Sequence, residues 1–268
     1  MKRPEQIWDD AVRLYKPAKI FALFSGGHDS LAVTHYAMNH GADGVAHVNT
    51  GIGVEQTRQF VRDTCARYRW PLYEYKAGAK YEDIIREHGF PGPSSHRYMY
   101  IMLKERGVEQ LLRDHKTKRS DRIMLVTGVR SSESVRRMGT VEPIKKVKAR
   151  VWVAPFIDYE KKDINAYIQE HELPRNEVVD HLHMSGECLC GAFAKKGELE
   201  QLQFFYPETA AEIRRIEKIA AEAGKPWGWE HPGPPEWYTL MKEGQQILGF
   251  ENDPQMLCTS CNKRHEEN

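Results

Sequence analysis

The chain has 268 residues, and 39 Lys and Arg balance 38 Asp and Glu, so the net charge of +1 gives no overall preference for a polyanionic partner. A hydrophobic content of 40% and a mean hydropathy of -0.65 are typical of a soluble globular protein and exclude intrinsic disorder and collagen-like order. No stretch approaches the roughly 18 apolar residues of a membrane helix, and the N-terminus lacks a secretory signal. We therefore expect a cytoplasmic protein without a membrane partner.

Short apolar runs alternate with stretches of helical periodicity over the first two thirds of the chain. The expected strands cover residues 20–24, 44–48, 72–75, 122–127 and 151–155, and the expected helices cover 4–15, 28–40, 54–69, 81–88 and 96–115. Such alternation is typical of parallel strands connected by helices that cover both faces of the sheet. The pattern predicts a doubly wound α/β fold with a mainly parallel, five-stranded sheet.

The pattern changes beyond Asn176. Residues 196–223 are expected to form two helices separated near Pro207, and a Pro-, Gly- and Trp-rich stretch follows. We therefore predict an α/β domain over residues 1–180 and a helical, cysteine-containing extension over 181–268. The aromatic residues of the extension could stack nucleic-acid bases or pack beneath an irregular loop; they are Trp227, Trp229, Trp237 and Tyr238.

A glycine-containing loop, Ser25-Gly26-Gly27-His28-Asp29-Ser30, joins the first expected strand to the next helix. The glycines permit a sharp turn and a close approach to a ligand, while the helix N-terminus presents free N–H groups and a positive dipole end. Ser25 and Ser30 add hydroxyl donors, Asp29 could hold Mg²⁺, and His28 could contact phosphate or face solvent. The loop therefore predicts a nucleotide site, although a simple capped strand-to-helix turn would use similar residues.

The string Ser-Gly-Gly-x-Asp-Ser resembles the signature of the PP-loop ATP pyrophosphatases, which hold the pyrophosphate that leaves when a substrate is adenylated. A second segment, from Gly128 through Arg130 and Glu133 to Arg136 and Arg137, resembles the Gly-x-Arg-x-x-Glu-Ser-x-x-Arg segment of the phosphoadenosine phosphosulfate (PAPS) reductase branch. The resemblance covers roughly residues 18–180 and implies an adenine nucleotide alpha-hydrolase-like fold. It implies nucleotide contacts from Ser25, Gly26, Gly27, His28, Asp29, Ser30, Gly128, Arg130 and Arg137, and catalytic roles for Asp29, Arg130, Glu133 and Arg136.

The near-neutral chain contains a strongly basic segment, residues 116–150, with eleven Lys or Arg and three acidic residues. Its arginines can pair with phosphate in a fork geometry. Lys145, Lys146 and Lys148 could equally belong to a solvated loop. If the segment binds nucleic acid, the phosphate backbone would supply affinity that depends on salt.

Four of the five cysteines form two close pairs, Cys188 with Cys190 and Cys258 with Cys261, while Cys65 lies in an expected helix. Four thiolates suit either a 4Fe-4S cluster or tetrahedral Zn²⁺. We predict that the two pairs hold one such centre, with unrelated free thiols as the alternative; His181, His183 and His265 could substitute in a zinc site.

The cysteine positions depart from those of the assimilatory reductases that the chain resembles. Thiol-dependent members carry a C-terminal Glu-Cys-Gly-x-His string, but the only Glu-Cys here is Glu187-Cys188. Cluster-bearing members carry adjacent cysteines upstream of the Gly-x-Arg segment, where this chain has Ser94-Ser95-His96-Arg97. The order found here is more similar to sulfur-inserting relatives, including DNA phosphorothioation enzymes.

The leading hypothesis is an ATP- and Mg²⁺-dependent pyrophosphatase that adenylates a substrate for sulfur transfer, favoured in DNA or tRNA sulfur modification. ATP, a nucleic acid and a cysteine desulfurase would be its partners, and a homodimer remains open. One alternative is a sulfonucleotide reductase that acts on PAPS or adenylylsulfate. The other is a non-catalytic module that senses nucleotide.

Overall fold

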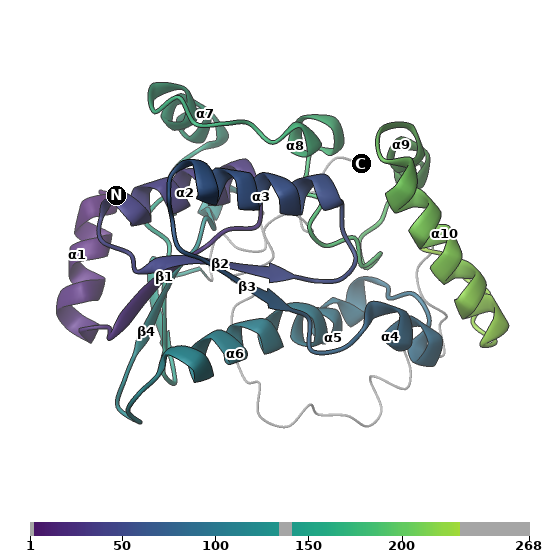
Figure 1. Cartoon of the computed structure of the whole chain (residues 1–268), viewed down its shortest axis with the longest axis horizontal. Coiled ribbons are helices and arrows are strands. Elements are labelled where there is room, and N and C mark those ends of the chain that lie inside the picture. The colour runs from purple at the N-terminus through teal and green to yellow at the C-terminus, as the bar shows by residue number, and fades with distance from the viewer. Residues whose placement is uncertain (1–2, 134–140, 231–268) are drawn as a thin grey trace.

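A computed structural model describes residues 3–133 and 141–230 and shows an α/β fold built on a single sheet (Figure 1). The strand order is β3-β2-β1-β4-β6-β5. The strands are β1 (Lys19–Leu23), β2 (Gly44–Asn49), β3 (Leu72–Lys76), β4 (Ile123–Val126), β5 (Ile144–Val147) and β6 (Arg150–Val153). Strands β1, β2, β3, β4 and β6 run parallel, so the predicted doubly wound α/β fold is confirmed.

The sheet has six strands rather than the predicted five, because the edge strand β5 was not predicted. Strand β5 pairs antiparallel with β6, with Ile144 opposite Val153 and Val147 opposite Arg150. Lys148, in the left-handed conformation at φ 54°, closes the turn between them. Lys145 and Lys146 made this segment resemble a charged loop, yet an edge strand tolerates such residues because lysine discourages pairing with another chain.

Helices cover both faces of the sheet (Figure 1). They are α1 (Pro4–Tyr15), α2 (His28–Asn39), α3 (Glu55–Arg67), α4 (Tyr81–His88), α5 (His96–Tyr100), α6 (Arg106–His115), α7 (Lys161–Glu170), α8 (Glu177–Leu182), α9 (Glu198–Phe205) and α10 (Pro207–Glu222). Helices α2 and α3 lie on one face and α6 lies on the other. The predicted helix break near Pro207 is present between α9 and α10.

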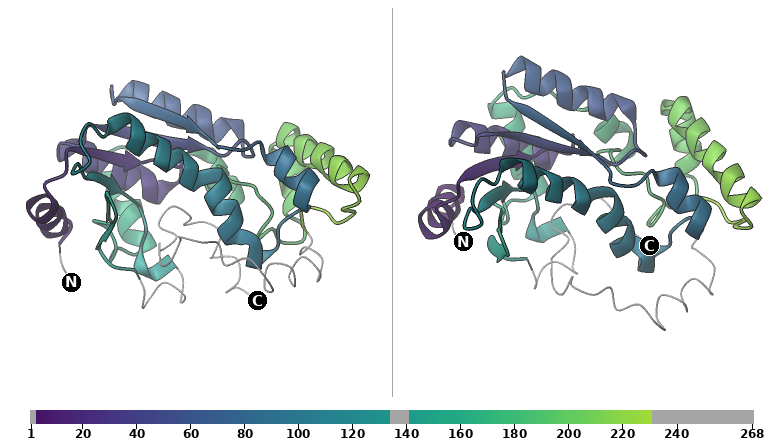
Figure 2. Two further views of the ribbon diagram at one scale, coloured as in Figure 1. Left: turned by 90° about the horizontal axis from the view of Figure 1, so that it is seen from below. Right: turned by 60° about the horizontal axis from the view of Figure 1, so that its bottom comes forward.

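The long helix expected over residues 96–115 contains one turn of π-helix, η2 (Ile101–Glu105), between α5 and α6. Figure 2 shows α5, η2 and α6 as one rod beneath the sheet. Glu105 is buried in this turn and forms an ion pair with Arg150 of β6. Since π-helical turns alter which side chains share a face, the turn changes the direction in which Lys104 projects relative to a regular helix.

Two hydrophobic cores hold the chain together. The first lies between the sheet and its helices, with Phe21, Leu125 and Trp152 almost fully buried. The second joins residues between 52 and 103 to residues between 178 and 229, and includes Phe90, Ile213 and Trp229. The predicted extension therefore packs its apolar side chains against earlier parts of the chain. The boundary at residue 180 remains a prediction.

In the portions that the structure describes, no helix is long and apolar enough to cross a membrane. The cytoplasmic location expected from the sequence remains a prediction.

Candidate nucleotide site

The loop from Ser25 to Ser30 lies at the carboxyl end of β1, where open α/β sheets bind ligands. Gly26 adopts a φ of +80°, and a Cβ on this residue would come within 2.5 Å of Cγ2 of Thr57 in α3. Both backbone conformation and space therefore require glycine here. Gly27 is the N-cap of α2, so the first N–H groups of that helix face the loop.

The two serines of the loop bond to each other. Oγ of Ser30 donates to the carbonyl of Gly27 at 2.8 Å and accepts from the N–H of Ser25 at 3.2 Å. The hydroxyl oxygens of Ser25 and Ser30 are 3.1 Å apart. These bonds hold the loop in a closed turn before any ligand contributes.

Asp29 and Arg130, both predicted as catalytic, form a two-point ion pair. Nε of Arg130 lies 3.1 Å from Oδ1 of Asp29, and Nη2 lies 3.2 Å from Oδ2. Nη1 of Arg130 donates to Oγ of Ser132 at 3.0 Å. The Arg130 side chain is 3% exposed and that of Asp29 is 23% exposed. A carboxylate has about four lone-pair positions and Arg130 uses two of them, so the remaining lone pairs of Asp29 could still hold a Mg²⁺ ion.

Gly128, at the carboxyl end of β4, allows this strand to approach the loop. A Cβ at Gly128 would come within 2.7 Å of the carbonyl carbon of Asp29 and 2.9 Å of the nitrogen of Ser30. The predicted role of Gly128 at the nucleotide site is therefore consistent with direct backbone contact between the two segments.

Two pockets meet at the serines of the loop. The apolar pocket is lined by Leu23, Phe24, Ala46, Val48, Lys104 and Glu187, among others. The polar pocket has a volume of about 360 Å³ and is lined by His28, Asp29, Arg130, Lys161, Arg175 and Asp180, among others. Ser25 and Ser30 line both pockets. The loop therefore separates the apolar pocket from the polar pocket.

His28 faces the polar pocket from the first position of α2. Burial, followed by the positive charge of Arg175, lowers the pKa of His28 below the ordinary histidine value. Its Nε2 is buried and has no hydrogen-bond partner among the described residues. Arg175 itself pairs with Asp180 at 2.6 Å. A neutral imidazole at this position can accept a hydrogen bond from a ligand.

The structure brings together most, but not all, of the residues predicted from sequence. Ser25, Gly26, Gly27, His28, Asp29, Ser30, Gly128 and Arg130 all lie at one end of the sheet. Glu133 ends the short helix η3 (Ser131–Glu133). Arg136 and Arg137 lie outside the described residues, so their phosphate contacts remain predictions.

The cysteine centre is described only in part, because Cys258 and Cys261 lie outside the described residues. Cys190 is buried and Cys188 is partly exposed. The carbonyl of Cys190 accepts a hydrogen bond of 3.0 Å from the Tyr81 hydroxyl. Over residues 3–133 and 141–230, no three His, Cys, Asp or Glu side chains form a group that could hold a metal. The described residues therefore do not show the cluster or zinc centre, which remains a prediction.

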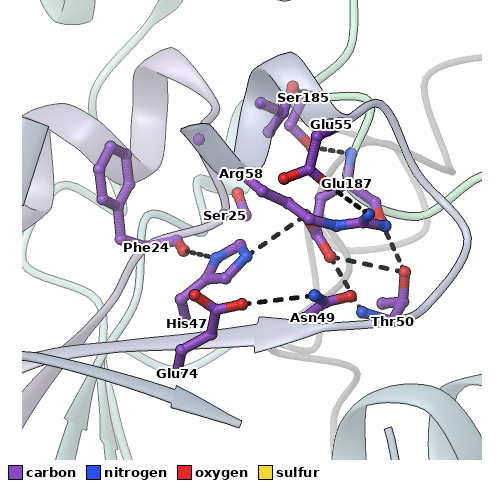
Figure 3. Close-up of polar contacts among 12 residues, drawn as sticks. Phe24, Ser25, His47, Asn49, Thr50, Glu55, Arg58, Glu74, Ser185 and Glu187 are labelled. Atoms are coloured by element: carbon purple, nitrogen blue, oxygen red, sulfur yellow. Dashed lines mark hydrogen bonds and ion pairs between the residues drawn. The ribbon is translucent and has the colours of Figure 1, made fainter. Parts of the chain in front are cut away.

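Sequence reasoning missed three residues that hold the loop in place, namely His47, Asn176 and Glu187. Nδ1 of His47 bonds to the carbonyl of Phe24 at 2.8 Å, and Nδ2 of Asn176 donates to the carbonyl of Gly26 at 2.8 Å. Figure 3 shows His47 and Glu187 between β2 and the loop. Burial lowers the pKa of His47, but the Glu187 carboxylate, the Phe24 carbonyl and the Glu74 carboxylate together raise it by more, so the net shift is upward. Asn176 is the N-cap of α8, and its side chain accepts a hydrogen bond from the N–H of Val178; asparagine is a preferred N-cap residue, so this signal could have been used.

Comparison with known proteins identifies the family. The model of the family described as "Phosphoadenosine phosphosulfate reductase domain" matches residues 19–188, which is more than half of the chain. The chain therefore belongs to the phosphoadenosine phosphosulfate reductase domain family.

Individual relatives are distant. The "Bifunctional protein TilS/HprT" of Listeria monocytogenes is 24% identical over 217 residues, covering 77% of this chain and 32% of that protein. The chain thus spans about a third of the length of the curated relatives it matches. The crystal structure of phosphoadenylyl-sulfate (PAPS) reductase from Candida auris in a phosphate complex has a TM-score of 0.50 and 19% identity, covering 67% of this chain and 84% of that one. Candida glabrata FMN adenylyltransferase in complex with ATP has a TM-score of 0.48 and 14% identity, covering 67% and 56%.

Proposed function

We propose that this protein binds ATP and Mg²⁺ at the loop from Ser25 to Ser30 and transfers AMP to an oxygen atom of its substrate. The observation that carries the proposal is the placement of this loop between the two pockets. The apolar pocket suits a purine base, and the polar pocket suits phosphates. A ligand with a base at one end and a triphosphate at the other matches this division.

In the proposed reaction the substrate oxygen attacks the α-phosphorus of ATP, the bond to the β,γ-pyrophosphate breaks, and the substrate becomes adenylated. The loop N–H groups and the α2 N-terminus would hold the departing pyrophosphate. Lys161 and Arg175 of the polar pocket would neutralise phosphate charge on nucleotide or substrate. Arg136 and Arg137 are proposed to add to this charge, and Glu133 to orient an arginine. The pairing of Arg130 with Asp29 indicates that Arg130 also orients this carboxylate.

The proposed second step is sulfur transfer to a nucleic acid. A sulfur nucleophile displaces AMP from the adenylated substrate, so a bond to sulfur forms and AMP carries the oxygen away. A cysteine desulfurase would deliver the sulfur as a persulfide, and a thiol reductant would supply the two electrons that release it. The basic residues between 116 and 150 support a phosphate-rich substrate.

The decisive measurement is pyrophosphate release from ATP by the full chain, with and without DNA or tRNA. We expect release that increases with the nucleic-acid substrate. Asp29→Ala should abolish it, since this change removes the carboxylate proposed to hold Mg²⁺ and the ion pair that this carboxylate forms with Arg130. Glu172→Ala, an exposed acidic residue after α7, is the matched control and should retain activity. ATP binding without release would favour the nucleotide-sensing alternative.

The family assignment favours one other activity, the reduction of a sulfonucleotide. In that reaction two electrons from thiols convert the sulfonate of PAPS or adenylylsulfate to sulfite. We expect no sulfite when the purified protein is supplied with either compound and a thiol donor, because the only Glu-Cys, Glu187-Cys188, lies before α9 and α10 and is not part of a Glu-Cys-Gly-x-His string. Sulfite formation would replace the adenylation proposal.

We further propose that Cys188 and Cys190 hold a 4Fe-4S cluster or Zn²⁺ together with Cys258 and Cys261. Such a centre would supply either redox chemistry or a structural link. Iron, zinc and acid-labile sulfide should be measured on anaerobically purified protein, and on a Cys188→Ser/Cys190→Ser variant with Cys65→Ser as control. Loss of metal from the double variant alone is expected; unchanged metal content would overturn the assignment.

A further inference from the structure

Glu187 is a buried carboxylate that joins several segments of the chain. It is 2% exposed and directly precedes Cys188. Its Oε1 accepts from the N–H of Thr50 at 3.0 Å, and its carbonyl accepts from the Thr50 hydroxyl at 2.6 Å. Its Oε2 lies 3.4 Å from Nε2 of His47 and 3.8 Å from Nε of Arg58. Figure 3 shows His47, Thr50 and Arg58 converging on this side chain.

Burying these polar and charged atoms costs free energy of folding. Oε2 of Glu187, Nε2 of His47 and Nε of Arg58 are buried, and none has a hydrogen-bond partner in the part of the chain that the structure describes. Well-packed apolar residues often stabilise a protein more than buried charges do, whereas removal of one partner leaves an uncompensated charge. The cluster therefore contributes defined geometry more than stability.

The backbone around Glu187 is joined to the loop between β2 and α3. The N–H of Leu189 bonds to the carbonyl of Ile52 at 2.9 Å, and the N–H of Val54 bonds to the carbonyl of Gly186 at 2.8 Å. A Cβ at Gly53 would lie 2.4 Å from the carbonyl oxygen of Glu187. Movement of either segment therefore displaces the other, because there is no free space between them.

Two routes lead from the Glu187 segment to the nucleotide loop, one through the ion-pair contact between Glu187 and His47 and one through hydrogen bonds. In the first, His47 lies between Glu187 and the carbonyl of Phe24, the residue before Ser25. In the second, the Thr57 hydroxyl donates to the carbonyl of Ser185 at 2.5 Å and accepts from Asn176 at 3.4 Å. Asn176 also donates to the carbonyl of Gly26.

We propose that Glu187 is a positioning residue that couples nucleotide binding at the loop from Ser25 to Ser30 to the order of the segment carrying Cys188 and Cys190. Nucleotide held against the loop would fix Phe24 and Gly26, and the two routes would transmit this order to the cysteines. Coupling is reciprocal, so loosening the cysteine segment must weaken nucleotide binding by the same factor. The inference rests on nucleotide binding as proposed above.

Hydrogen–deuterium exchange of the full chain, with and without Mg²⁺ and a non-hydrolysable ATP analogue, tests the coupling. In the wild-type protein we expect the analogue to slow exchange in a peptide covering 24–31 and in one covering 185–191. Glu187→Gln should retain the first effect at saturating analogue and lose the second, while its affinity for the analogue falls about tenfold, within the usual range of coupling. Glu177→Gln, an exposed residue of α8, is the matched control and should behave as wild type.

The possible results separate the two proposals. If the analogue fails to protect 24–31 in the wild-type protein, nucleotide binding itself is wrong. If 24–31 is protected and 185–191 is unchanged, the coupling is wrong and nucleotide binding stands. This comparison needs no variant, so it remains informative if Glu187→Gln fails to fold. Glu187→Asp keeps the charge but shortens the side chain, so it should restore part of the protection of 185–191. If Glu187→Asp loses this protection as completely as Glu187→Gln does, a role for the carboxylate is contradicted.

Discussion

Lys104 belongs to no recognisable sequence motif, and the backbone conformation of its helix places it at the apolar pocket. It lies in the π-helical turn, which Glu105 fixes to the sheet through Arg150, and it lines the apolar pocket beside Ser25 and Ser30. A cation here would lie close to the junction between base and phosphates of a bound nucleotide. We therefore expect Lys104 to contact the α-phosphate.

Replacement of Lys104 by Met keeps most of its apolar stem and removes its charge. We expect the dissociation constant for ATP to rise about 10- to 100-fold, the loss expected when a hydrogen bond to a charged group is removed. Lys146→Met, an exposed lysine of β5, makes the same change in net charge and should have no such effect. Equal affinities of the two variants, measured by calorimetry, would exclude the contact.

Individual site residues were predictable from sequence when their function depends on local chain geometry. Gly26 and Ser30 belong to one contiguous string after an apolar strand, so their place in a strand-to-helix loop could be recognised from sequence alone, whereas their role at a nucleotide site remains a prediction. His47 and Glu187 are 140 positions apart and meet only through tertiary packing. No local pattern marks such a pair, and Glu187 was visible only as the residue before a cysteine.

Helix α2 carries a histidine whose environment makes the packing against α7 depend on pH. Nδ1 of His35 bonds to the Tyr167 hydroxyl at 2.9 Å, and its Nε2 lies 3.1 Å from the Asn39 amide nitrogen. Burial, and then the neighbouring His171, lowers the pKa of His35 to about 4. Asn39 donates to the neutral ring, so protonation would oppose this contact.

Stability should therefore fall as pH decreases from about 6.5, the ordinary histidine pKa, toward about 4. In this range the unfolded chain takes up a proton on His35 and the folded chain does not. Because His35 is only half-buried, we expect a loss of about 1 kcal/mol after allowing for solvent screening. Chemical denaturation at pH 7 and pH 5 should show a smaller pH effect in His35→Gln than in wild type. The control His88→Gln, in α4, should retain the wild-type pH effect.

Elements differed in how well the sequence predicted them. The central parallel strands are largely buried and therefore appear as short apolar runs, as in Ile123–Val126. Strand β5 is at an edge and carries Lys145 and Lys146, so the apolar signal is absent. The π-helical turn inserts no proline or glycine, and for this reason it appeared in sequence as part of one continuous helix.

At the scale of the whole molecule, the second core determines which parts of the chain can fold alone. Tyr81, Phe90 and Leu103 contribute to it from the first half, and Ile213 and Trp229 contribute from the second. Burial of apolar surface is the main stabilising contribution to folding. Neither set can bury its apolar surface without the other.

A fragment covering residues 181–268 should therefore be largely unfolded on its own. We expect no cooperative thermal transition by circular dichroism and few dispersed amide signals by nuclear magnetic resonance. Mixing it with a 1–180 fragment should restore helical signal if the second core can assemble between the two. Cooperative melting of the isolated fragment, measured without the 1–180 fragment, would show instead that the predicted boundary separates independent domains.

Because Ser25 and Ser30 separate the two pockets, ligands smaller than ATP should bind more weakly than ATP itself. AMP would place its base on one side of the two serines and pyrophosphate would lie on the other, each with only its own contacts. ATP joins the two groups covalently, so binding of the first end gives the second a high local concentration. If the protein acts as proposed, it would hold the intact nucleotide more tightly than either part and would release pyrophosphate once the bond to the α-phosphate is broken, without moving either pocket.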